Sequence, residues 1–329
     1  MSSSFDIQPV GRFHGQSAVI KRPKEIACFS YDDEHKFRLD DSSVRYYYPP
    51  TLGADLSKGF DTFEKLDDTA DDHLDSLLKT IMALEQKEGK RVEADVITWR
   101  GMMTKFLAAI FTDRDGFEMN ATLFQGTIFI EENHGYKLDS QKRQSQQRPQ
   151  PGRPSQDMMS FWGYKFETLC LLPTTWDETP RDFIENRESE ITSAEIRGDR
   201  DMVNFERKLM KFWIQSFLLG VPKIIVGFRT PDGILKRLEN ISTASIPSTV
   251  QRKGNATWDG NMCINFAAGL LDFLKATITE DGVWRIRRKE RSSAIEVFRV
   301  EEAGHGDIIP DDFLNWRIKL AVQSQTSSE

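Results

Sequence analysis

The stretch KLMKFWIQSFLLGVPKIIVGFRTPDG, residues 208–233, decides the fold of this chain. Its first part completes an amphipathic helix from about Met202 to Leu219, which ends at Gly220, a common stop signal. The apolar run KIIVGF, 223–228, predicts a buried strand, and the PDG that follows predicts a turn into a second strand over 234–238.

Further elements flank this stretch on both sides. Apolar residues at helical spacing predict helices over 71–85, 101–111, 159–169, 261–277 and 311–320. Short apolar or alternating runs predict strands over 95–99, 117–124, 127–131, 283–287 and 294–300. We expect the chain up to about residue 65 to be irregular. Strands and helices that mix without strict alternation predict an α/β (α+β) fold, with a mixed β-sheet core and flanking helices.

Composition restricts the kind of protein. Apolar residues make up 39% and charged residues 29% of the 329 positions, as in ordinary globular proteins. A net charge of −7 argues against coating nucleic acid by bulk electrostatics, so a polyanion would need a local basic site. Three widely spaced cysteines suit a reducing compartment. We expect neither a secretory signal nor a membrane span, because the most apolar stretch is interrupted by glycine, proline and lysine.

One segment is of low complexity. QKRQSQQRPQPGRPSQ, residues 141–156, is rich in Gln, Arg, Pro and Ser and cannot bury apolar surface. We expect a mobile loop over 137–157 and a disordered tail over 322–329. The basic residues of the loop could contact RNA, although a solvated insertion is the favoured interpretation.

Three positions are candidates for chemistry, and spacing alone leaves each open. Arg100 lies where a strand should pass into a helix, so it could bind phosphate beside free helical N–H groups or form a structural ion pair. Glu167 flanks an apolar helix face and could bind a cation or remain solvated. Gln215 shares a helix face with Lys208 and Lys211, which could bind phosphate and sugar oxygens or form an ordinary wet face.

Several motifs together resemble one family, the decapping nucleases related to mammalian DXO and to the fungal nuclear partner of the 5′→3′ exoribonuclease. The resemblance covers nearly the whole chain, and the 26-residue block at 208–233 is its most specific part. The other matching stretches, in order, are EIACFS at 25–30, RYYYPP at 45–50, HLDSLL at 73–78, TWRG at 98–101, FQGTIFIEE at 124–132, WGYKFE at 162–167 and NMCINFAA at 261–268.

This resemblance implies a core related to the PD-(D/E)xK nucleases and a divalent metal cofactor, Mg²⁺ or Mn²⁺. The implied activities are removal of incomplete or non-canonical caps, release of pyrophosphate from 5′-triphosphate RNA and, in some members, 5′→3′ digestion. Metals in such sites polarise the phosphate and activate water. The implied partners are RNA 5′ ends and a nuclear 5′→3′ exoribonuclease, which places the chain in the nucleus, with the cytoplasm as a second location.

The resemblance also assigns roles by position. Glu167 matches the first metal-binding and catalytic glutamate, from the Gly-aromatic-x-aromatic-Glu motif. Arg100 faces phosphate on the RNA path, which Trp99 and Gly101 also line, and Gln215 contacts the nucleotide. His35 and Asp72 match positions at which the family makes weaker contacts with the substrate.

The chain departs from the family after GYKFE. The family there has Glu-apolar-Asp and then Glu-apolar-Lys, whereas here FIENRESEI, 183–191, joins directly to TSAEIRGDRD, 192–201. A segment of a few tens of residues with both motifs is missing between Glu190 and Thr192. We expect unpaired backbone and exposed apolar surface where the family has central strands, and impaired catalysis. Glu185, Glu188 or Glu190 would be the substitutes at hand.

The resulting hypothesis is a single decapping-nuclease domain over 1–329 that hydrolyses RNA 5′ ends in its intact form. The alternative is a catalytically inactive subunit that stabilises a nuclear 5′→3′ exoribonuclease, with the ends of strands 223–228 and 234–238 as conceivable docking sites.

Overall fold

The computed structural model describes residues 2–65, 67, 69–146, 152–172, 189–194, 199–252 and 256–326. Of residues 144, 189–194, 199–204, 324 and 326 it describes the backbone alone. The chain divides into two compact units, each built from segments far apart in the sequence. The first unit contains 1–40, 70–139 and 261–329, and the second contains 41–69 and 140–260.

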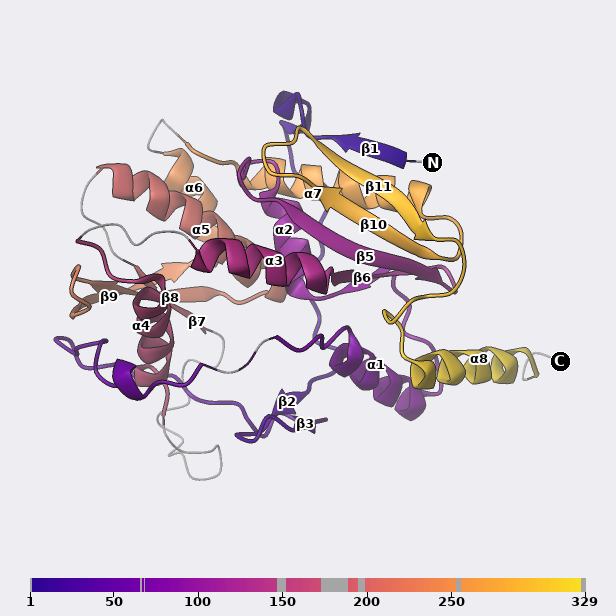
Figure 1. Ribbon diagram of the computed structural model, residues 1–329, viewed down its shortest axis with the longest axis horizontal. Helices are drawn as coiled ribbons and strands as arrows, with labels where there is room; N and C mark the ends of the chain where they lie inside the picture. Colours follow the sequence, from indigo (N-terminus) through magenta and orange to yellow (C-terminus); the bar gives the residue numbers. More distant parts are fainter. Residues whose placement is uncertain are drawn as a thin grey trace. The chain divides into compact units, whose positions relative to one another are not determined.

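A six-stranded mixed sheet forms the centre of the first unit (Figure 1). All neighbouring strands are antiparallel except β4 and β6, which are parallel. In sheet order the strands are β1 (Ser2–Asp6), β11 (Ala294–Glu301), β10 (Val283–Arg288), β5 (Phe117–Phe124), β6 (Thr127–Glu132) and β4 (Val96–Thr98). The predicted mixed sheet is therefore confirmed.

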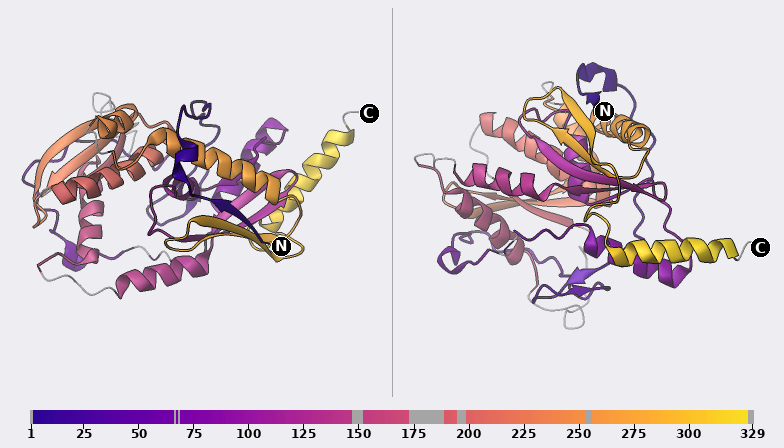
Figure 2. Two further views of the ribbon diagram at one scale, coloured as in Figure 1. Left: turned by 90° about the horizontal axis from the view of Figure 1, so that it is seen from above. Right: turned by 45° about the vertical axis from the view of Figure 1, so that its right-hand side comes forward.

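Helices pack on this sheet through apolar faces. Phe5 of β1 contacts Phe266 and Phe273 of α7 (Gly260–Thr277), which lies along the sheet in Figure 2. A second cluster joins α1 (Asp75–Glu88), β4, β6 and α8 (Asp311–Thr326) around buried Phe129 and Phe313. The remaining elements are α2 (Arg100–Ala108), α3 (His134–Ser145), the 3-10 turn Val10–Phe13 and the hairpin of β2 (Ser30–Tyr31) and β3 (Phe37–Arg38).

The second unit contains a three-stranded sheet in the order β7-β8-β9. Its strands are β7 (Ser189–Ala194), β8 (Lys223–Arg229) and β9 (Leu235–Ser242), and its helices are α4 (Gln156–Leu169), α5 (Asp199–Leu219) and α6 (Ile246–Gln251), with 3-10 turns at Phe60–Thr62 and Thr243–Ser245. The core joins α4 to β9 through buried Phe161, Trp162, Phe166, Cys170 and Leu235. The stretch 208–233 thus forms the helix, strand and turn that its pattern predicts.

The turn between β8 and β9 requires glycine. Gly233 has φ +89°, and a Cβ there would lie 2.7 Å from the Trp162 ring. The same indole donates to Ser57 Oγ at 2.9 Å. The PDG turn therefore fits under Trp162 because position 233 has no side chain.

Three expectations for local structure are wrong. Ser2–Asp6 forms β1, which the sequence does not mark because its order comes from pairing with β11. Residues 137–145 continue α3 and 156–157 begin α4, so the predicted loop over 137–157 is shorter; its centre, 147–151, lies outside the described residues. Residues 322–326, expected in the disordered tail, extend α8, and 327–329 lie outside the described residues.

At the proposed deletion, the expected unpaired backbone is not found on β8 but is found on the outer side of β7, which is an edge strand among the described residues. β7 spans the junction and pairs in parallel with β8 from Ser189–Lys223 to Ala194–Phe228. The other side of β8 pairs with β9, so β8 has neighbours on both sides.

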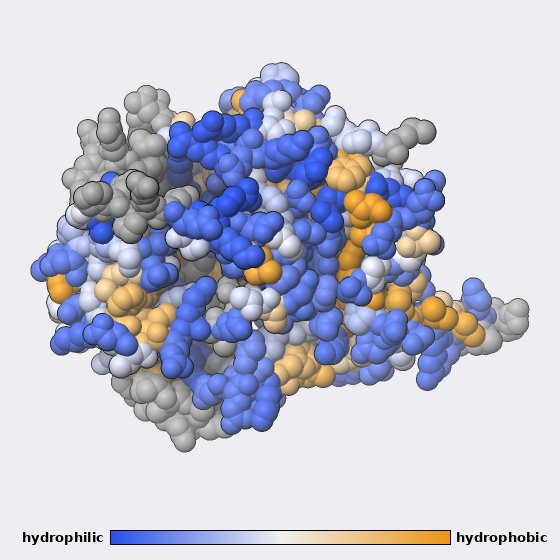
Figure 3. All heavy atoms as spheres, viewed as in Figure 1, coloured by the Kyte–Doolittle hydropathy of each residue, from blue (hydrophilic) through white to orange (hydrophobic). Residues whose placement is uncertain are grey.

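The surface is mostly hydrophilic on the face drawn in Figure 3, with apolar residues along α8. Ile318 and Val322 of this helix are 53% and 56% exposed. Among the described residues, no helix is both long and apolar enough to cross a membrane.

Candidate functional site

A pocket of about 410 Å³ lies in the first unit, where the ends of several elements meet. The β2–β3 hairpin, the loop before α1, the β4–α2 junction, the end of β6 and the start of α3 all contribute to its wall. The lining residues are Phe29, Tyr31, His35, Ala70, Asp71, Asp72, His73, Trp99, Met102, Glu131, Glu132, His134 and Lys137.

Flat rings form one side of the pocket. Tyr31 and His35 stack with centroids 4.5 Å apart and planes 10° apart. Phe29 meets Trp99 edge to face at 6.2 Å and also contacts Phe37 at 5.5 Å. Such rings suit stacking by nucleic-acid bases, which bind proteins through their π-faces.

Trp99 and Arg100 form the start of α2 beside these rings. Trp99 is the N-cap in an extended conformation, φ −69° and ψ 146°, and Arg100 is the first helical residue. The Arg100 side chain is exposed, and within the part of the chain that the structure describes it has no hydrogen bond or ion pair. Free N–H groups at a helix N-terminus together with a guanidinium suit phosphate oxygens.

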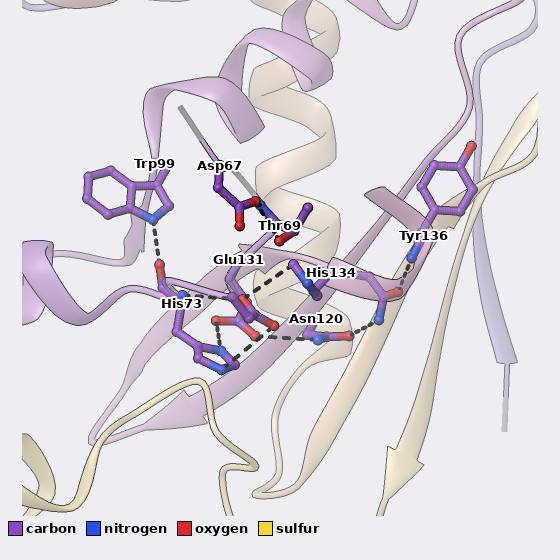
Figure 4. Close-up of polar contacts among 10 residues, drawn as sticks. Asp67, Thr69, His73, Trp99, Asn120, Glu131, His134 and Tyr136 are labelled. Atoms are coloured by element: carbon purple, nitrogen blue, oxygen red, sulfur yellow. Dashed lines mark hydrogen bonds and ion pairs between the residues drawn. The ribbon is translucent and has the colours of Figure 1, made fainter. Parts of the chain in front are cut away.

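His73 and Glu131 form a partly buried ion pair next to Trp99 (Figure 4). His73 Nδ1 lies 3.0 Å from Glu131 Oε2, and the Glu131 side chain is 4% exposed. Asn120 Nδ2 donates a longer hydrogen bond, 3.4 Å, to the other oxygen of Glu131. The carbonyl of His73 accepts the Trp99 indole N–H at 2.8 Å, so the pair connects to the aromatic side of the pocket.

The pair has perturbed proton affinities. Burial alone would lower the pKa of His73, but the charges of Glu131 and Asp71 outweigh burial and raise it. Burial raises the pKa of Glu131, and its attraction to His73 offsets this in part. Shifted titratable groups in a pocket are a mark of functional sites.

Further charged groups surround the pair. Asp71 lies 3.7 Å from His73 Nε2 and 4.0 Å from His134 Nδ1. Glu132 forms an ion pair with Lys105 of α2. The pocket therefore combines aromatic rings with several carboxylates. Because carboxylates repel phosphate, basic groups at the edge of the pocket would have to neutralise the phosphate groups.

The structure brings together part of the predicted site. His35, Asp72 and Trp99 line one pocket, and Arg100 and Gly101 follow Trp99 as the first residues of α2. The predicted transition from strand to helix at Arg100 is confirmed.

Glu167 and Gln215 lie in the second unit and are described within it. Glu167 is exposed near the end of α4, and its charge helps raise the pKa of Cys170 to about 12, chiefly an effect of burial of that thiol. Gln215 is half-buried on α5, next to buried Ile214 and Ser216.

A metal site is not found in the described part of the chain. Within those residues, no group of three or more His, Cys, Asp or Glu could hold a metal ion. Magnesium needs several hard oxygen ligands in near-octahedral geometry, which Glu167 alone does not supply. Of the possible substitutes, Glu185 and Glu188 lie outside the described residues and Glu190 is described by its backbone alone.

The sequence did not predict the partnership of His73 and Glu131. Two other histidines, His134 and His305, are half-buried, and His305 Nδ1 lies 2.9 Å from Thr122 Oγ1. The one available signal was Glu131 directly after the apolar run TIFI, because a carboxylate in a buried strand needs a partner.

Known proteins resemble the chain along nearly its whole length. The model of the RAI1 like PD-(D/E)XK nuclease family matches residues 21–193 and 191–314. The decapping nuclease RAI1 of Gibberella zeae is 54% identical over 376 aligned positions, covering the whole of both chains. That of Aspergillus fumigatus is 56% identical, covering 95% of this chain and 98% of its own. The structure of Candida albicans Rai1 in complex with pU5-Mn2+ is 25% identical and covers 97% of this chain and all of its own, with a TM-score of 0.83.

Proposed function

Because the chain belongs to the RAI1-like PD-(D/E)XK nuclease family, we propose that it acts on RNA 5′ ends. The family places the chain among the hydrolases. The substrates we propose are RNAs with incomplete or non-canonical caps and RNAs with a 5′-triphosphate, from which pyrophosphate is released. The observation that supports an RNA substrate best is the aromatic pocket beside the exposed Arg100.

In this proposal the aromatic rings of the pocket bind the base, and the positive groups beside it bind the phosphate. Trp99, Tyr31 and His35 offer faces on which a base can stack. Arg100 and the N–H groups at the start of α2 bind the adjoining phosphate. Asp72 contacts the nucleotide from the loop before α1, and Gly101 leaves the start of the helix open to the backbone of the RNA.

The second unit supplies the remaining proposed residues. Gln215 contacts the nucleotide with its amide, and Glu167 is the remaining member of the metal site. A divalent ion belongs to the chemistry of this family, and Mn²⁺ is present in the Candida albicans complex. Mg²⁺ and Mn²⁺ are both candidates here. The described side chains do not fit such an ion, since they form no ligand cluster.

This misfit agrees with an internal deletion. The family model matches in two pieces that meet at residues 191–193. The alignment with the Gibberella zeae protein has 376 positions against 329 residues in this chain, so at least 47 positions have no counterpart here. We propose that these positions include the Glu-apolar-Asp and Glu-apolar-Lys motifs and that the chain is impaired in hydrolysis.

A second function follows from the same misfit. A chain that keeps the fold and lacks the ligand cluster is suited to binding rather than catalysis, as a subunit that stabilises a nuclear 5′→3′ exoribonuclease. The ends of β8 and β9 are the docking sites we propose, and the nucleus is the proposed location, with the cytoplasm as a second one.

Release of pyrophosphate from 5′-triphosphate RNA in the presence of Mn²⁺ tests these proposals. The Gibberella zeae relative serves as the positive control, and the Glu167→Ala and Arg100→Ala variants of this chain as the negative ones. Impairment predicts at least a hundredfold slower release than the relative, since removal of one transition-state contact already costs roughly that factor. Release at the relative's rate, abolished by Glu167→Ala, would overturn the proposed impairment.

Transcript sequencing across codons 188–193 tests the deletion itself. A longer transcript with both motifs would show that the gap does not belong to the natural protein.

A further inference from the structure

The orientation of Trp99 depends on a residue outside the aromatic wall. Its indole N–H donates to the backbone carbonyl of His73 at 2.8 Å. Trp99 is half-buried, and its side chain forms no capping hydrogen bond with α2. The position of the His73 carbonyl therefore sets the angle at which the Trp99 ring faces the pocket.

The backbone of His73 is itself in an unusual conformation. Its φ is +43°, a left-handed value that residues with a side chain rarely adopt. Such a conformation persists when surrounding contacts hold it. The carbonyl direction therefore depends on whatever fixes the rest of His73.

Two carboxylates fix His73. Glu131 Oε2 lies 3.0 Å from its Nδ1, and Asp71 Oδ1 accepts its backbone N–H at 3.3 Å. Figure 4 shows the imidazole pointing at Glu131 while the carbonyl faces Trp99. Glu131 is held in turn by β6 and by Asn120, whose Oδ1 accepts from Asn133 Nδ2 at 3.1 Å.

We propose that His73 and Glu131 are positioning residues for RNA binding. The ion pair stabilises the left-handed backbone of His73, and the His73 carbonyl orients the Trp99 indole. Trp99 in turn fixes the start of α2, where Arg100 is placed to bind phosphate. Neither residue of the pair needs to take part in bond cleavage. The identity of the ligand, RNA, rests on the proposed function. The structural link between Glu131 and Trp99 does not.

The arrangement makes RNA affinity depend on pH. His73 is held most firmly when it is protonated and faces an ionised Glu131, and Asp71 and Asp307 add attraction. The other charged groups lining the same pocket are Asp72, Glu132, His134 and Lys137. As pH rises through the pKa of His73 the attraction is lost, so RNA binding should weaken on the alkaline side.

Indole NMR tests the link within the protein. The full chain is labelled with ¹⁵N-tryptophan, and Trp99→Phe identifies the Trp99 cross-peak among the signals of seven tryptophans. In the wild type this peak should titrate above the ordinary histidine value of 6.5, because the pKa of His73 is raised. In His73→Asn the peak should move and lose this titration. In Glu131→Gln it should move and titrate at lower pH, because His73 keeps its imidazole but loses the carboxylate that raises its pKa. Asparagine tolerates the left-handed backbone, so His73→Asn removes the ion pair with little backbone strain.

A matched control comes from another carboxylate of the same sheet. Glu118 of β5 pairs with Arg285 at 2.9 Å and does not line the pocket. Glu118→Gln makes the same chemical change as Glu131→Gln and should leave the Trp99 peak and its titration as in the wild type.

RNA affinity is measured separately, by fluorescence anisotropy of a 5′-monophosphorylated oligoribonucleotide in EDTA, where no hydrolysis occurs. Near pH 6, His73→Asn and Glu131→Gln should weaken binding about tenfold, the equivalent of one charge-assisted hydrogen bond. Glu118→Gln should bind as the wild type does.

The two measurements separate the possible failures. An indole peak that ignores both pH and Glu131→Gln would overturn the positioning proposal even if RNA binds normally. A responsive peak with unchanged RNA affinity in the pair variants, and in Trp99→Ala, would instead overturn the assignment of the pocket to RNA, and the proposal with it.

Discussion

Two buried carboxylates of the first unit differ in how completely they are hydrogen-bonded. Glu85 of α1 is fully buried and receives Val92 N–H at 2.9 Å, Trp316 Nε1–H at 2.9 Å and Arg317 Nε–H at 2.8 Å. Arg317 Nη2 adds an ion pair at 2.6 Å. Both oxygens of Glu85 are therefore saturated.

Glu131 is nearly as buried but receives fewer donors. It has His73 at 3.0 Å and Asn120 at 3.4 Å, and it lines the aromatic pocket. A saturated carboxylate joined to a buried arginine connects α1 to α8 and belongs to the core. A partly saturated one, joined to a titratable histidine at a pocket, can change charge without disrupting the core. The comparison separates an ion pair within the core from one that lines the pocket.

The largest expected effect is on the pair within the core. Glu85→Ala leaves Arg317 charged and buried, which should lower the free energy of unfolding by about 3–5 kcal/mol. Chemical denaturation of the wild type and the variant measures this loss of unfolding free energy. The double variant Glu85→Met with Arg317→Met is the control, and it should recover most of the loss because it removes both charges. A loss below about 1 kcal/mol in Glu85→Ala would contradict the structural role.

A smaller, pH-dependent effect is expected for the pair that lines the pocket. The pKa of His73 is raised by Glu131 and Asp71 against the effect of burial, so its stabilising contribution is complete below the ordinary value of 6.5 and is lost as pH rises through the folded value. Burial raises the pKa of Glu131 above 4.5, which also makes stability fall with rising pH. Relative to wild type, His73→Asn should cost about 2 kcal/mol near pH 5.5 and less at alkaline pH.

Urea denaturation at several pH values checks this trend. A deficit of His73→Asn that grows with pH would show that the histidine is held as the neutral form, which is the opposite of our expectation.

The smallest effect is expected at Glu118. Its ion pair with Arg285 is partly exposed, with side chains 20% and 24% accessible, so Glu118→Gln should change the free energy of unfolding by less than about 1 kcal/mol. Equal losses in Glu118→Gln and Glu85→Ala would remove the distinction between partly exposed and fully buried pairs.

Local patterns predicted much of the fold. The strands at 117–124 and 127–131 and the block at 208–233 match β5, β6, α5 and β8 closely, because their apolar periodicity and glycine or proline ends are encoded within each segment. β1 was missed because SSSFD has no such pattern and becomes a strand through pairing with distant β11. The two units were not foreseen either, since each is assembled from non-contiguous segments without a linker between them.

The candidate site was predicted unevenly. His35, Asp72 and Trp99 came from the family resemblance, and they do line one pocket. Residue types pointed at most to Glu131 and gave no indication of its partner His73, which lies 58 residues away in the loop before α1. The roles of Glu167 and Gln215 stay predictions.

The parallel ladder between β7 and β8 places few demands on the side chains at the proposed deletion. A ladder is made by main-chain amides, so an in-frame junction can supply six extended residues to β8 whatever their side chains were selected to do. β8 therefore keeps a paired neighbour whatever side chains the proposed deletion removes.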